Sequence, residues 1–335
     1  MGVYIIAEAG VNHNGSVELA IEMIDRAKQC GCDCIKFQTF KTENIVTRYA
    51  KKANYQVVNT HNEGSQYSML KELELSFNDF SVIKKYCDEI EIDFMSTPFD
   101  MASVDLLEKL GVSVYKISSG DITNKQLLEY VADKKKPMII STGMCTMDEV
   151  KEAVKWIEER GNNQITILHC TSHYPTPYDE VNMNAMQTLN QEFSYNVGYS
   201  DHTQGIIIPI MAVCMGATVI EKHFTLDKNM EGPDHRASLD IEELKEMVES
   251  IRNVEMAKGN GEKKPSRSEK NTRVAARKSI VMKRAMKKGE ILSLEDLEIK
   301  RPGVGIEPKY LENICGRVLL RDLDIEEILS LSDLE

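Results

Sequence analysis

The amino-acid sequence predicts an α/β protein whose larger part is a (β/α)8 TIM barrel, followed by a small second domain. Short apolar runs rich in β-formers alternate with helical patterns eight times within residues 1–225. Strands this apolar are typical of a parallel sheet covered by helices on both faces. Eight units are what a closed barrel requires. The alternative, a doubly wound open sheet, usually has fewer units and a GxGxxG turn, which the sequence lacks.

The predicted elements follow one another in a regular order. Eight strands are predicted, at residues 3–9, 32–38, 92–98, 112–119, 137–142, 164–170, 195–201 and 217–223. Helical patterns at 16–29 and 147–160 lie between strands, with Ser16 in an N-cap position. Gly111 is placed to end the helix before the fourth strand. The last barrel helix is predicted at 241–257.

A second, smaller unit follows the barrel. The polar stretch 258–273 has no apolar periodicity and predicts an exposed linker. The predicted division is a catalytic barrel at 1–258, a linker at 259–276 and a small domain at 277–335. Within that domain we expect a strand at 279–283, turns at 287–290 and 301–305, and a short helix near 308–314. So small a unit is marginal alone and is expected to pack against the barrel or a partner chain.

Composition excludes several classes of partner. The formal net charge of −12 argues against nucleic acid and anionic membranes. No stretch approaches the length of a membrane span, and the first residues lack the basic region of a signal peptide, so we expect a cytoplasmic protein. The eight cysteines are scattered, which disfavours a disulfide framework. Cys30, Cys32 and Cys34 are interpreted as a helix end running into a buried strand rather than as a metal site.

Polar residues follow most of the predicted strands. In a (β/α)8 barrel the side chains at the C-terminal ends of the strands surround the active site. These positions carry Glu8, Lys36, Gln38, Ser96, Thr97, Lys116, Ser118, Ser119, Ser141, Thr142, Thr171, Ser172, Tyr174, Asp201, His202, Glu221 and His223. Together they predict a polar, partly cationic pocket.

Lys36 and Lys116 each lie inside an apolar strand, where an unpaired ammonium group would be costly. A single such lysine would be interpreted as reaching the surface along the strand edge. Two at matching strand ends, the second followed by SSGD, favour a site for an anion such as phosphate. A Schiff-base lysine, as in class I aldolases, is the rival functional interpretation, and the residues alone leave it open.

His202 and His223 end the seventh and eighth predicted strands. A single histidine at a strand end is more often structural than a ligand. Neighbouring strands lie about 4.8 Å apart, so two such imidazoles can converge on one divalent ion. In the tail, KRPGVG (300–305) alone indicates no more than a surface turn containing Arg301.

A set of ordered motifs resembles a known family. EAGVNHNGS, KFQTF, STPFD, YKISSGD, STGM, HCTSHYPTP, GYSDHT, EKHFTLDKNMEGPDH and KRPGVG span essentially the whole chain. The chain resembles the bacterial sialic acid (nonulosonate) synthases, which include N-acetylneuraminate and N,N'-diacetyllegionaminate synthases. The resemblance implies a barrel followed by an antifreeze-like (SAF) domain, in a domain-swapped homodimer. It also implies that phosphoenolpyruvate condenses with N-acetylmannosamine or 2,4-diacetamido-2,4,6-trideoxymannose to give a nine-carbon 2-keto acid and phosphate.

The resemblance assigns roles to individual residues. It implies that His202 and His223 bind a catalytic divalent metal, Mn²⁺ or Mg²⁺. The residues that resemble the phosphoenolpyruvate-binding set are Lys36, Thr97, Lys116, Ser119 and Ser141. Those that match positions near the sugar are Glu8, Gln38, Tyr174, Glu221 and Asp234. Arg301 matches a tail arginine that reaches the partner subunit's active site and contacts the N-acetyl group.

Two positions depart from the N-acetylneuraminate pattern. Asp121 stands where that pattern usually has glutamate, as a proposed acid that contacts the sugar. Ser172 stands near the expected phosphate position, where some members have asparagine. Both departures bear on sugar specificity and phosphate geometry rather than on the reaction class. The SGDITN and KKANYQ stretches lean toward the legionaminate-type branch.

The implied mechanism has three steps. C3 of phosphoenolpyruvate attacks the polarised aldehyde of the open-chain sugar, a water positioned by Glu8 or Glu221 adds at C2, and phosphate leaves. Lys36 and Lys116 would hold the phosphate and carboxylate charges. Two alternatives remain at this point: a Schiff-base pyruvate aldolase, and a non-enzymatic carbohydrate-binding protein.

Overall fold

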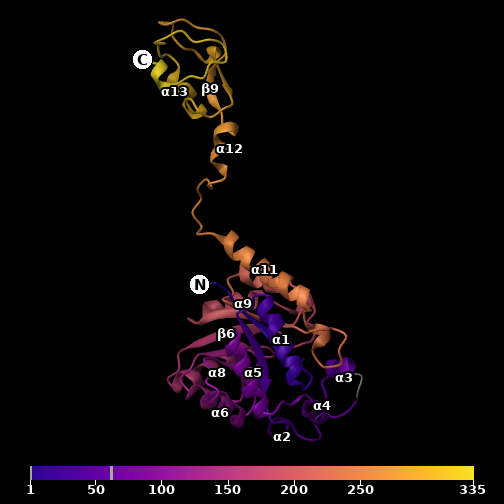
Figure 1. The fold of residues 1–335 in the computed structure, drawn as a ribbon. Helices are drawn as coiled ribbons and strands as arrows, with labels where there is room; N and C mark the ends of the chain where they lie inside the picture. Colours follow the sequence, from indigo (N-terminus) through magenta and orange to yellow (C-terminus); the bar gives the residue numbers. More distant parts are fainter. Residues whose placement is uncertain (1, 61–62) are drawn as a thin grey trace. The chain divides into compact units, whose positions relative to one another are not determined.

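The computed structural model describes residues 2–60 and 63–335. The chain forms two compact units, Met1–Gly259 and Asn260–Glu335. Figure 1 shows both units along the chain, and each is described by itself.

The first unit is built on eight parallel strands. These are β1 (Tyr4–Gly10), β2 (Cys34–Thr39), β3 (Asp93–Pro98), β4 (Tyr115–Ile117), β5 (Met138–Ser141), β6 (Ile165–Cys170), β7 (Asn196–Asp201) and β8 (Val219–His223). Hydrogen-bonded neighbours run in the order β3-β2-β1-β8-β7-β6-β5-β4, and β3 also lies beside β4. The sheet is therefore a nearly closed barrel, and the fold predicted from the sequence is confirmed.

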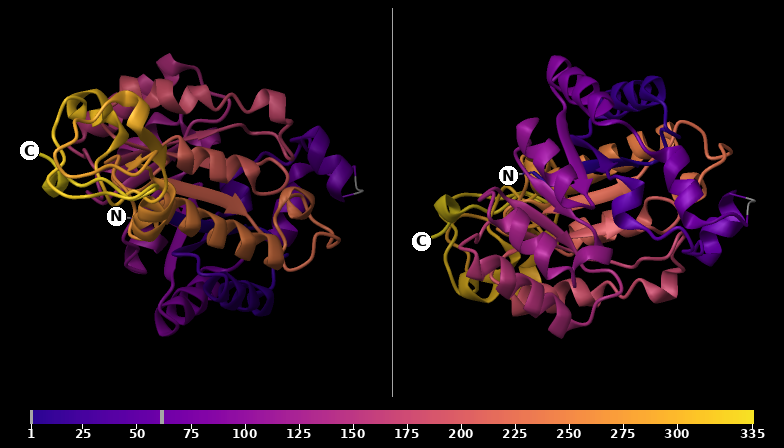
Figure 2. Two further views of the ribbon diagram at one scale, coloured as in Figure 1. Left: turned by 90° about the horizontal axis from the view of Figure 1, so that it is seen from above. Right: turned by 90° about the horizontal axis from the view of Figure 1, so that it is seen from below.

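Helices cover the outside of the barrel (Figure 2). They are α1 (Val17–Gln29), α5 (Phe77–Glu89), α6 (Met101–Lys109), α7 (Lys125–Ala132), α8 (Met147–Glu159), α9 (Asn184–Glu192), α10 (Ile207–Cys214) and α11 (Ile241–Lys258). Ser16 caps α1 by accepting a hydrogen bond from the backbone N–H of Leu19, as predicted. Gly111, with φ +73°, follows the end of α6 and permits the turn into β4. Cys30 ends α1 and Cys34 begins β2 in the buried core, so the interpretation of this cysteine cluster is confirmed.

Alternation along the strands separates the barrel interior from its outer face. On β1, Ile5 and Ala7 belong to the core between sheet and helices, whereas Ile6 packs inside the barrel with Cys34 and Met95. The next inward position on β1 is Glu8. The apolar layer that includes Ile6 is thus the floor beneath a charged layer at the C-terminal ends of the strands.

An insertion between β2 and α5 was not predicted from the sequence. It contains α2 (Thr42–Ile45), α3 (Asn54–Thr60) and α4 (Gln66–Leu73), which lie together at one end of the first unit (Figure 1). A small buried cluster of Val11, Phe40, Met69 and Leu73 attaches the insertion to the loop after β1. This end of the unit is the one toward which the C-terminal ends of the strands point.

The second unit has its own core, built from residues such as Ile280, Met286 and Leu329. Strands β9 (Ser279–Met282) and β10 (Leu297–Lys300) pair antiparallel, and α13 (Leu311–Ile314) follows a short 3-10 turn at Pro308–Tyr310. The expected strand and short helix of this unit are confirmed. Its packing against the barrel or a partner chain stays a prediction.

The linker is exposed throughout, as predicted, and its C-terminal part contains a helix that was not predicted. Residues Glu269–Ala276 form α12. The Glu269 carboxylate accepts a hydrogen bond from the backbone N–H of Ser266, 2.6 Å away, at the start of this helix. The segment lacks apolar periodicity because α12 buries no face, so the pattern that identifies most helices is missing there.

Within the described parts of the chain, no helix combines the length and the apolar character needed to cross a lipid bilayer.

Candidate active site

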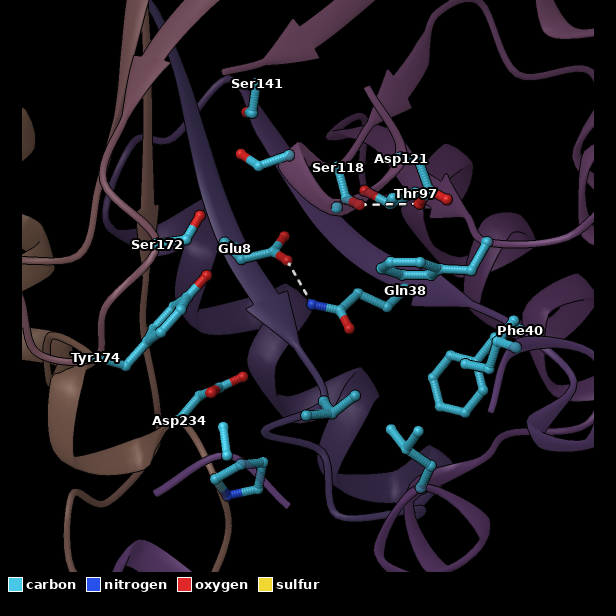
Figure 3. Close-up of a pocket in the computed structure, with 18 of the residues that line it drawn as sticks. Glu8, Gln38, Phe40, Thr97, Ser118, Asp121, Ser141, Ser172, Tyr174 and Asp234 are labelled. Carbon is cyan, nitrogen blue, oxygen red and sulfur yellow. Dashed lines mark hydrogen bonds between the residues drawn. The ribbon is translucent and has the colours of Figure 1, made fainter. Parts of the chain in front are cut away.

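A cavity of about 660 Å³ opens at the C-terminal ends of the barrel strands. Every residue of the first unit to which the family resemblance assigned a role lines this cavity, whereas the strand-end residues Ser96, Thr142, Thr171 and Asp201 do not; ten residues of the lining are labelled in Figure 3. The predicted residues brought together are Glu8, Lys36, Gln38, Thr97, Lys116, Ser119, Asp121, Ser141, Ser172, Tyr174, His202, Glu221, His223 and Asp234. Arg301 lies in the second unit, where it is exposed, and its place in a partner's pocket stays a prediction.

The centre of the cavity is a buried network of opposite charges. Strand register sets Glu8 beside Lys36 of β2 and beside His223 of β8. The Lys36 ammonium lies 2.8 Å from Oε2 of Glu8 and 3.7 Å from Oε2 of Glu221, and it donates to Oγ1 of Thr97 at 3.1 Å. Each of these charges is compensated by a neighbour, which is what permits them to be buried.

The second lysine faces a group of hydroxyls. Nζ of Lys116 donates to Oγ of Ser141 at 2.7 Å and lies 3.8 Å from Oε1 of Glu221. Nearby, the backbone N–H of Gly143 donates to Oγ of Ser119 at 2.9 Å. A Cβ atom at Gly143 would lie 2.2 Å from Oγ of Ser172, so a larger residue here would displace that hydroxyl from the backbone. A cation, several hydroxyls and an accessible backbone form a suitable cradle for a phosphate group.

The two central carboxyl groups have opposite pKa shifts. Burial raises the pKa of Glu8 to about 7, with Lys36 opposing and Glu221 adding to the rise. Burial acts in the same direction on Glu221, but Lys116, Lys36 and the Ser200 hydroxyl outweigh it and lower the pKa of that carboxyl. Two carboxyl groups held in different protonation states can serve as a proton donor and a proton acceptor in one reaction.

The two lysines also differ. Burial disfavours the charged form of both ammonium groups. At Lys36 the charges of Glu221 and Glu8 outweigh burial, and the pKa is raised. At Lys116 burial outweighs the attraction of Glu221, and the pKa is lowered. Lys36 is therefore held as a cation by the protein itself. At Lys116 a bound anion would favour the protonated, charged form of the side chain.

The two histidines converge at the edge of this network. Their ring centroids are 5.4 Å apart. Nδ1 of His202 lies 2.7 Å from the carbonyl oxygen of Thr171, and because a carbonyl only accepts, Nδ1 carries the proton and Nε2 is left free to bind. Burial, followed by the charges of His202 and Lys36, holds the pKa of His223 well below its usual value, so that imidazole is neutral.

These features fit a divalent metal. Nδ1 of His223 is buried and has no hydrogen-bond partner among the described residues, and a buried unpaired nitrogen is costly unless a ligand satisfies it. Imidazole nitrogens are common ligands of divalent transition-metal ions. No group of three His, Cys, Asp or Glu side chains in the described ranges is arranged to hold a metal by itself. An ion at the two histidines would therefore take its other ligands from water or substrate.

One wall of the cavity is aromatic and acidic. The Tyr174 ring lies 4.1 Å from the His202 ring and 5.1 Å from the Tyr55 ring, centroid to centroid. Asp234 lies beside Tyr174 at the cavity edge (Figure 3), and burial raises the pKa of its carboxyl to about 6. This wall offers a stacking surface next to a carboxyl group that changes charge near neutral pH.

The opposite wall carries Gln38 and Asp121. The Gln38 amide donates to Oε1 of Glu8 at 3.3 Å (Figure 3). Asp121 accepts hydrogen bonds from the Ser118 hydroxyl at 2.9 Å and from the Asn124 amide at 3.3 Å. Burial raises the pKa of Asp121. Its carboxyl is thus fixed in place by two neighbours and directed along the cavity wall.

Asp201 does not face the cavity. It was predicted to line the pocket, but its carboxylate lies 2.5 Å from Nζ of Lys222, and both side chains are fully buried. Asp201 also accepts from the Tyr199 hydroxyl at 3.0 Å and the backbone N–H of Thr203 at 3.1 Å. Alternation explains the error: because His202 follows β7 with its ring toward the cavity, the preceding side chain points to the outer face.

Sequence reasoning missed the contribution of the insertion. Residues of α2, α3 and α4 line the outer part of the cavity, among them Ile45, Tyr55, Gln56, Met69 and Leu70. The available signal was the long interval between the second and third strands. A long βα loop at the C-terminal end of a barrel strand is where such enzymes place binding residues.

Comparison with protein families decides what kind of protein this is. A family model described as the NeuB family matches residues 23–263, which is most of the chain. The chain belongs to the NeuB family. A second model, the SAF domain, matches residues 277–335. The resemblance that the sequence motifs indicated is therefore confirmed, including the small C-terminal domain.

Several relatives of this NeuB family member have named activities. An N,N'-diacetyllegionaminic acid synthase of Legionella pneumophila is 50% identical, over 96% of this chain and 92% of that protein. One of Campylobacter jejuni is 47% identical, over 97% of this chain and 98% of that protein. The crystal structure of an N-acetylneuraminic acid synthetase of Leptospira borgpetersenii has a TM-score of 0.72 at 34% identity, over 81% of this chain and 90% of that one. This family member is an enzyme of the nonulosonic acid synthase type, and the non-enzymatic alternative is excluded.

Proposed function

We propose that the enzyme condenses phosphoenolpyruvate with an N-acetylated mannose-type sugar, forming a nine-carbon 2-keto acid and phosphate. The observation that carries this proposal is the cavity in which Lys36 and Lys116 flank the carboxylate of Glu221, next to two converging histidines. Two ammonium groups and a hydroxyl cradle suit a ligand with both a phosphate and a carboxylate. Two carboxyl groups with opposite pKa shifts suit a reaction that both donates and accepts a proton.

We infer that the sugar is 2,4-diacetamido-2,4,6-trideoxymannose rather than N-acetylmannosamine. The support is the identity of 50% and 47% to two diacetyllegionaminic acid synthases, against 34% to the N-acetylneuraminic acid synthetase. Asp121, which lines the cavity, is consistent with this choice. Its side chain is one methylene shorter than the glutamate of the N-acetylneuraminate pattern, so it leaves more room for the sugar.

In the mechanism we propose, the chain's own residues bind the reactants and move two protons. Lys116, Ser119 and Ser141 hold the phosphate, and Lys36 neutralises the carboxylate charge near Glu8. C3 of phosphoenolpyruvate forms a bond to the aldehyde carbon of the sugar. The aldehyde oxygen takes a proton from Glu8, whose raised pKa keeps that proton available near neutral pH.

The second half of the reaction is the addition of water. Glu221, held as a carboxylate, accepts a proton from a water as the water oxygen bonds to C2 of the former phosphoenolpyruvate. The C2–O bond to phosphate then breaks, and phosphate leaves with the electron pair and takes the proton held by Glu221. The remaining C2 hydroxyl passes its proton to Glu8 and becomes the 2-keto group, so both carboxyl groups return to their starting states. His202 and His223 would hold a Mn²⁺ or Mg²⁺ ion, whose chemistry when bound is polarisation of a carbonyl oxygen.

The test is phosphate release from phosphoenolpyruvate by the purified enzyme, with the sugar and Mn²⁺ or Mg²⁺ supplied. We expect release that requires both substrates, stops on chelation and is lost in His202→Ala. Release without sugar, or none with either sugar, would contradict the proposal. A pyruvate–lysine adduct trapped by borohydride would instead establish the Schiff-base aldolase, with Lys116 as the first candidate because of its lowered pKa.

We also propose a homodimer in which Arg301 enters the active site of the partner subunit and contacts the N-acetyl group. A mixing experiment tests this. Arg301→Ala and His202→Ala homodimers should each be inactive, and co-expression should restore part of the activity, because a mixed dimer contains one intact site. If co-expression restores nothing, the shared site is wrong. The cytoplasmic location stays a prediction from the sequence.

A further inference from the structure

The cavity has two chemically different ends. Toward the barrel floor it is lined by charged groups, including Lys36, Lys116 and Glu221. Toward the insertion it is lined by apolar side chains, namely Phe40, Ile45, Val46, Met69, Leu70 and Leu73. Figure 3 places Phe40 and Ser141 at opposite sides of the cavity. A ligand that spans the cavity therefore has one end among charges and the other against apolar groups.

The apolar end is a packed surface rather than a set of chance contacts. Phe40, Met69 and Leu73 are buried together with Val11. Phe40 and Phe99 pack edge to face with ring centroids 6.3 Å apart. Ile45 and Leu70 lie against this cluster, are only partly buried, and line the cavity. These two side chains are the part of the apolar surface that a ligand can touch without moving the insertion.

Carboxamide groups from the same insertion lie among the apolar side chains. Asn44, Gln56 and Gln66 all line the cavity. Oε1 of Gln56 accepts a hydrogen bond from the backbone N–H of Ala53 at 2.9 Å, which fixes the orientation of the buried amide. A side-chain amide beside apolar groups matches an N-acyl substituent, which has an amide and a methyl group of its own.

We propose that α2 and α4 form a subsite for the distal end of the sugar, and that this subsite selects C-methyl and N-acyl groups over hydroxyls. The inference rests on the proposed function, because it assumes that the aldehyde end of the sugar meets phosphoenolpyruvate at the charged end. A hydroxyl placed against Ile45 and Leu70 loses its water partners without gaining new ones. A hydrophobic pocket rejects an added hydroxyl by a factor of up to about 10².

The test compares kcat/KM for three acceptors at saturating phosphoenolpyruvate and Mn²⁺. They are 2,4-diacetamido-2,4,6-trideoxymannose, 6-deoxy-N-acetylmannosamine and N-acetylmannosamine. We expect the first to be preferred to the last by about 10-fold to 100-fold. 6-Deoxy-N-acetylmannosamine has the C-methyl group but not the second N-acetyl group, so its kcat/KM separates the effect of the methyl group from that of the second acyl group.

Two variants connect the preference to the subsite. Leu70→Gln should reduce the preference for the diacylated sugar about five-fold or more, chiefly by raising its KM, because it places a polar group on the apolar surface. The matched control, Leu70→Met, keeps the surface apolar and should leave the preference within about two-fold. If Leu70→Gln does not fold, Ile45→Thr on α2 carries the same test at a partly buried position.

The outcomes separate this inference from the proposed function. Equal kcat/KM for all three sugars, or a preference unchanged in folded Leu70→Gln and Ile45→Thr, would overturn the subsite while leaving the condensation intact. Absence of phosphate release with every sugar would instead contradict the proposed function. A preference that falls in Leu70→Gln and persists in Leu70→Met would establish the subsite.

Discussion

Strand β8 carries buried charge on both of its faces, and the two faces are organised differently. Glu221 points into the barrel, where its two oxygens lie 3.7 and 3.8 Å from the ammonium groups of Lys36 and Lys116. Lys222 points outward and lies 2.5 Å from Asp201. The inner charges surround a cavity of about 660 Å³, whereas the outer pair is enclosed by packed side chains.

The difference lies in how fully each charge is satisfied by the protein itself. Lys222 bonds to Asp201 and to the carbonyl oxygen of Thr203, and Asp201 accepts two further hydrogen bonds from Thr203 and one from Tyr199. In the inner network the oxygens of Glu221 lie farther from their lysines, and Nδ1 of His223 has no hydrogen-bond partner among the described residues. A buried charged group whose hydrogen bonds and ion pairs are all made within the protein supports the fold. One that is incompletely paired is available to a ligand.

The largest expected effect is on the inner face. Glu221→Gln keeps the size of the side chain and removes the carboxylate that we propose as proton acceptor. We expect phosphate release to fall by about 10² to 10⁴-fold, which is typical of losing a general base. The temperature midpoint of unfolding should fall less than when the Lys222–Asp201 pair is broken, because the amide can still accept from the Ser200 hydroxyl, now 2.9 Å from Oε1, and Lys36 keeps Glu8 as a partner. A variant that loses stability instead of activity would place Glu221 with the structural pair.

The outer face should show the reverse pattern. Lys222→Met leaves the Asp201 carboxylate buried without its cation, and removing one partner of such a pair typically costs about 3–5 kcal/mol. Chemical denaturation measures this loss of the free energy of unfolding. Activity per folded molecule should fall far less than in Glu221→Gln, since Lys222 does not line the cavity.

A double variant sharpens that prediction. Asp201→Asn with Lys222→Met removes both charges, so it should recover at least half of the stability that Lys222→Met loses. Equal destabilisation in the single and double variants would show that packing around Lys222, rather than its charge, is what matters.

The sequence predicted the inner face better than the outer one, for a physical reason. Strand ends in a barrel share one edge, so the positions of Lys36, Lys116, His202 and His223 could be read from the order of the strands alone. The partner of Lys222 depends on which face each residue occupies, and a shift of one residue reverses that choice. The insertion was missed because its helices are short and make their contacts through tertiary packing, with little periodicity of their own.

The pH dependence of stability gives a smaller test of the inner face. Burial raises the pKa of Glu8 from 4.5 to about 7, so between those values the folded chain holds a proton that the unfolded chain has released. The folded state then binds more protons, and its stability falls as the pH rises through this window. Glu8→Gln removes this titration, and its unfolding midpoint should fall less over the same range.

Asp234 serves as the matched comparison for that measurement. Burial raises the pKa of its carboxyl to about 6, so Asp234→Asn should flatten the lower part of the same window. If Glu8→Gln and the parent enzyme lose stability in parallel from pH 4.5 to 7, Glu8 does not hold a proton in the folded state.

The smallest expected effect comes from an ion pair whose carboxylate is exposed to solvent. On α5, Nζ of Lys84 lies 2.6 Å from Asp88 one helical turn away, and the Asp88 side chain is 62% exposed. Its separation is almost the same as that of the Lys222–Asp201 pair, so distance alone would predict equal importance. Asp88→Ala should nevertheless change the free energy of unfolding by only about 0.3–0.5 kcal/mol, and added salt should reduce even that, because water screens the exposed pair.

Glu89→Ala, which removes the partner of Lys85 on the same helix, is the matched control and should behave alike. A loss at Asp88 as large as that of Lys222→Met would mean that burial does not set the energy of these ion pairs, and the contrast between the two faces of β8 would need another cause.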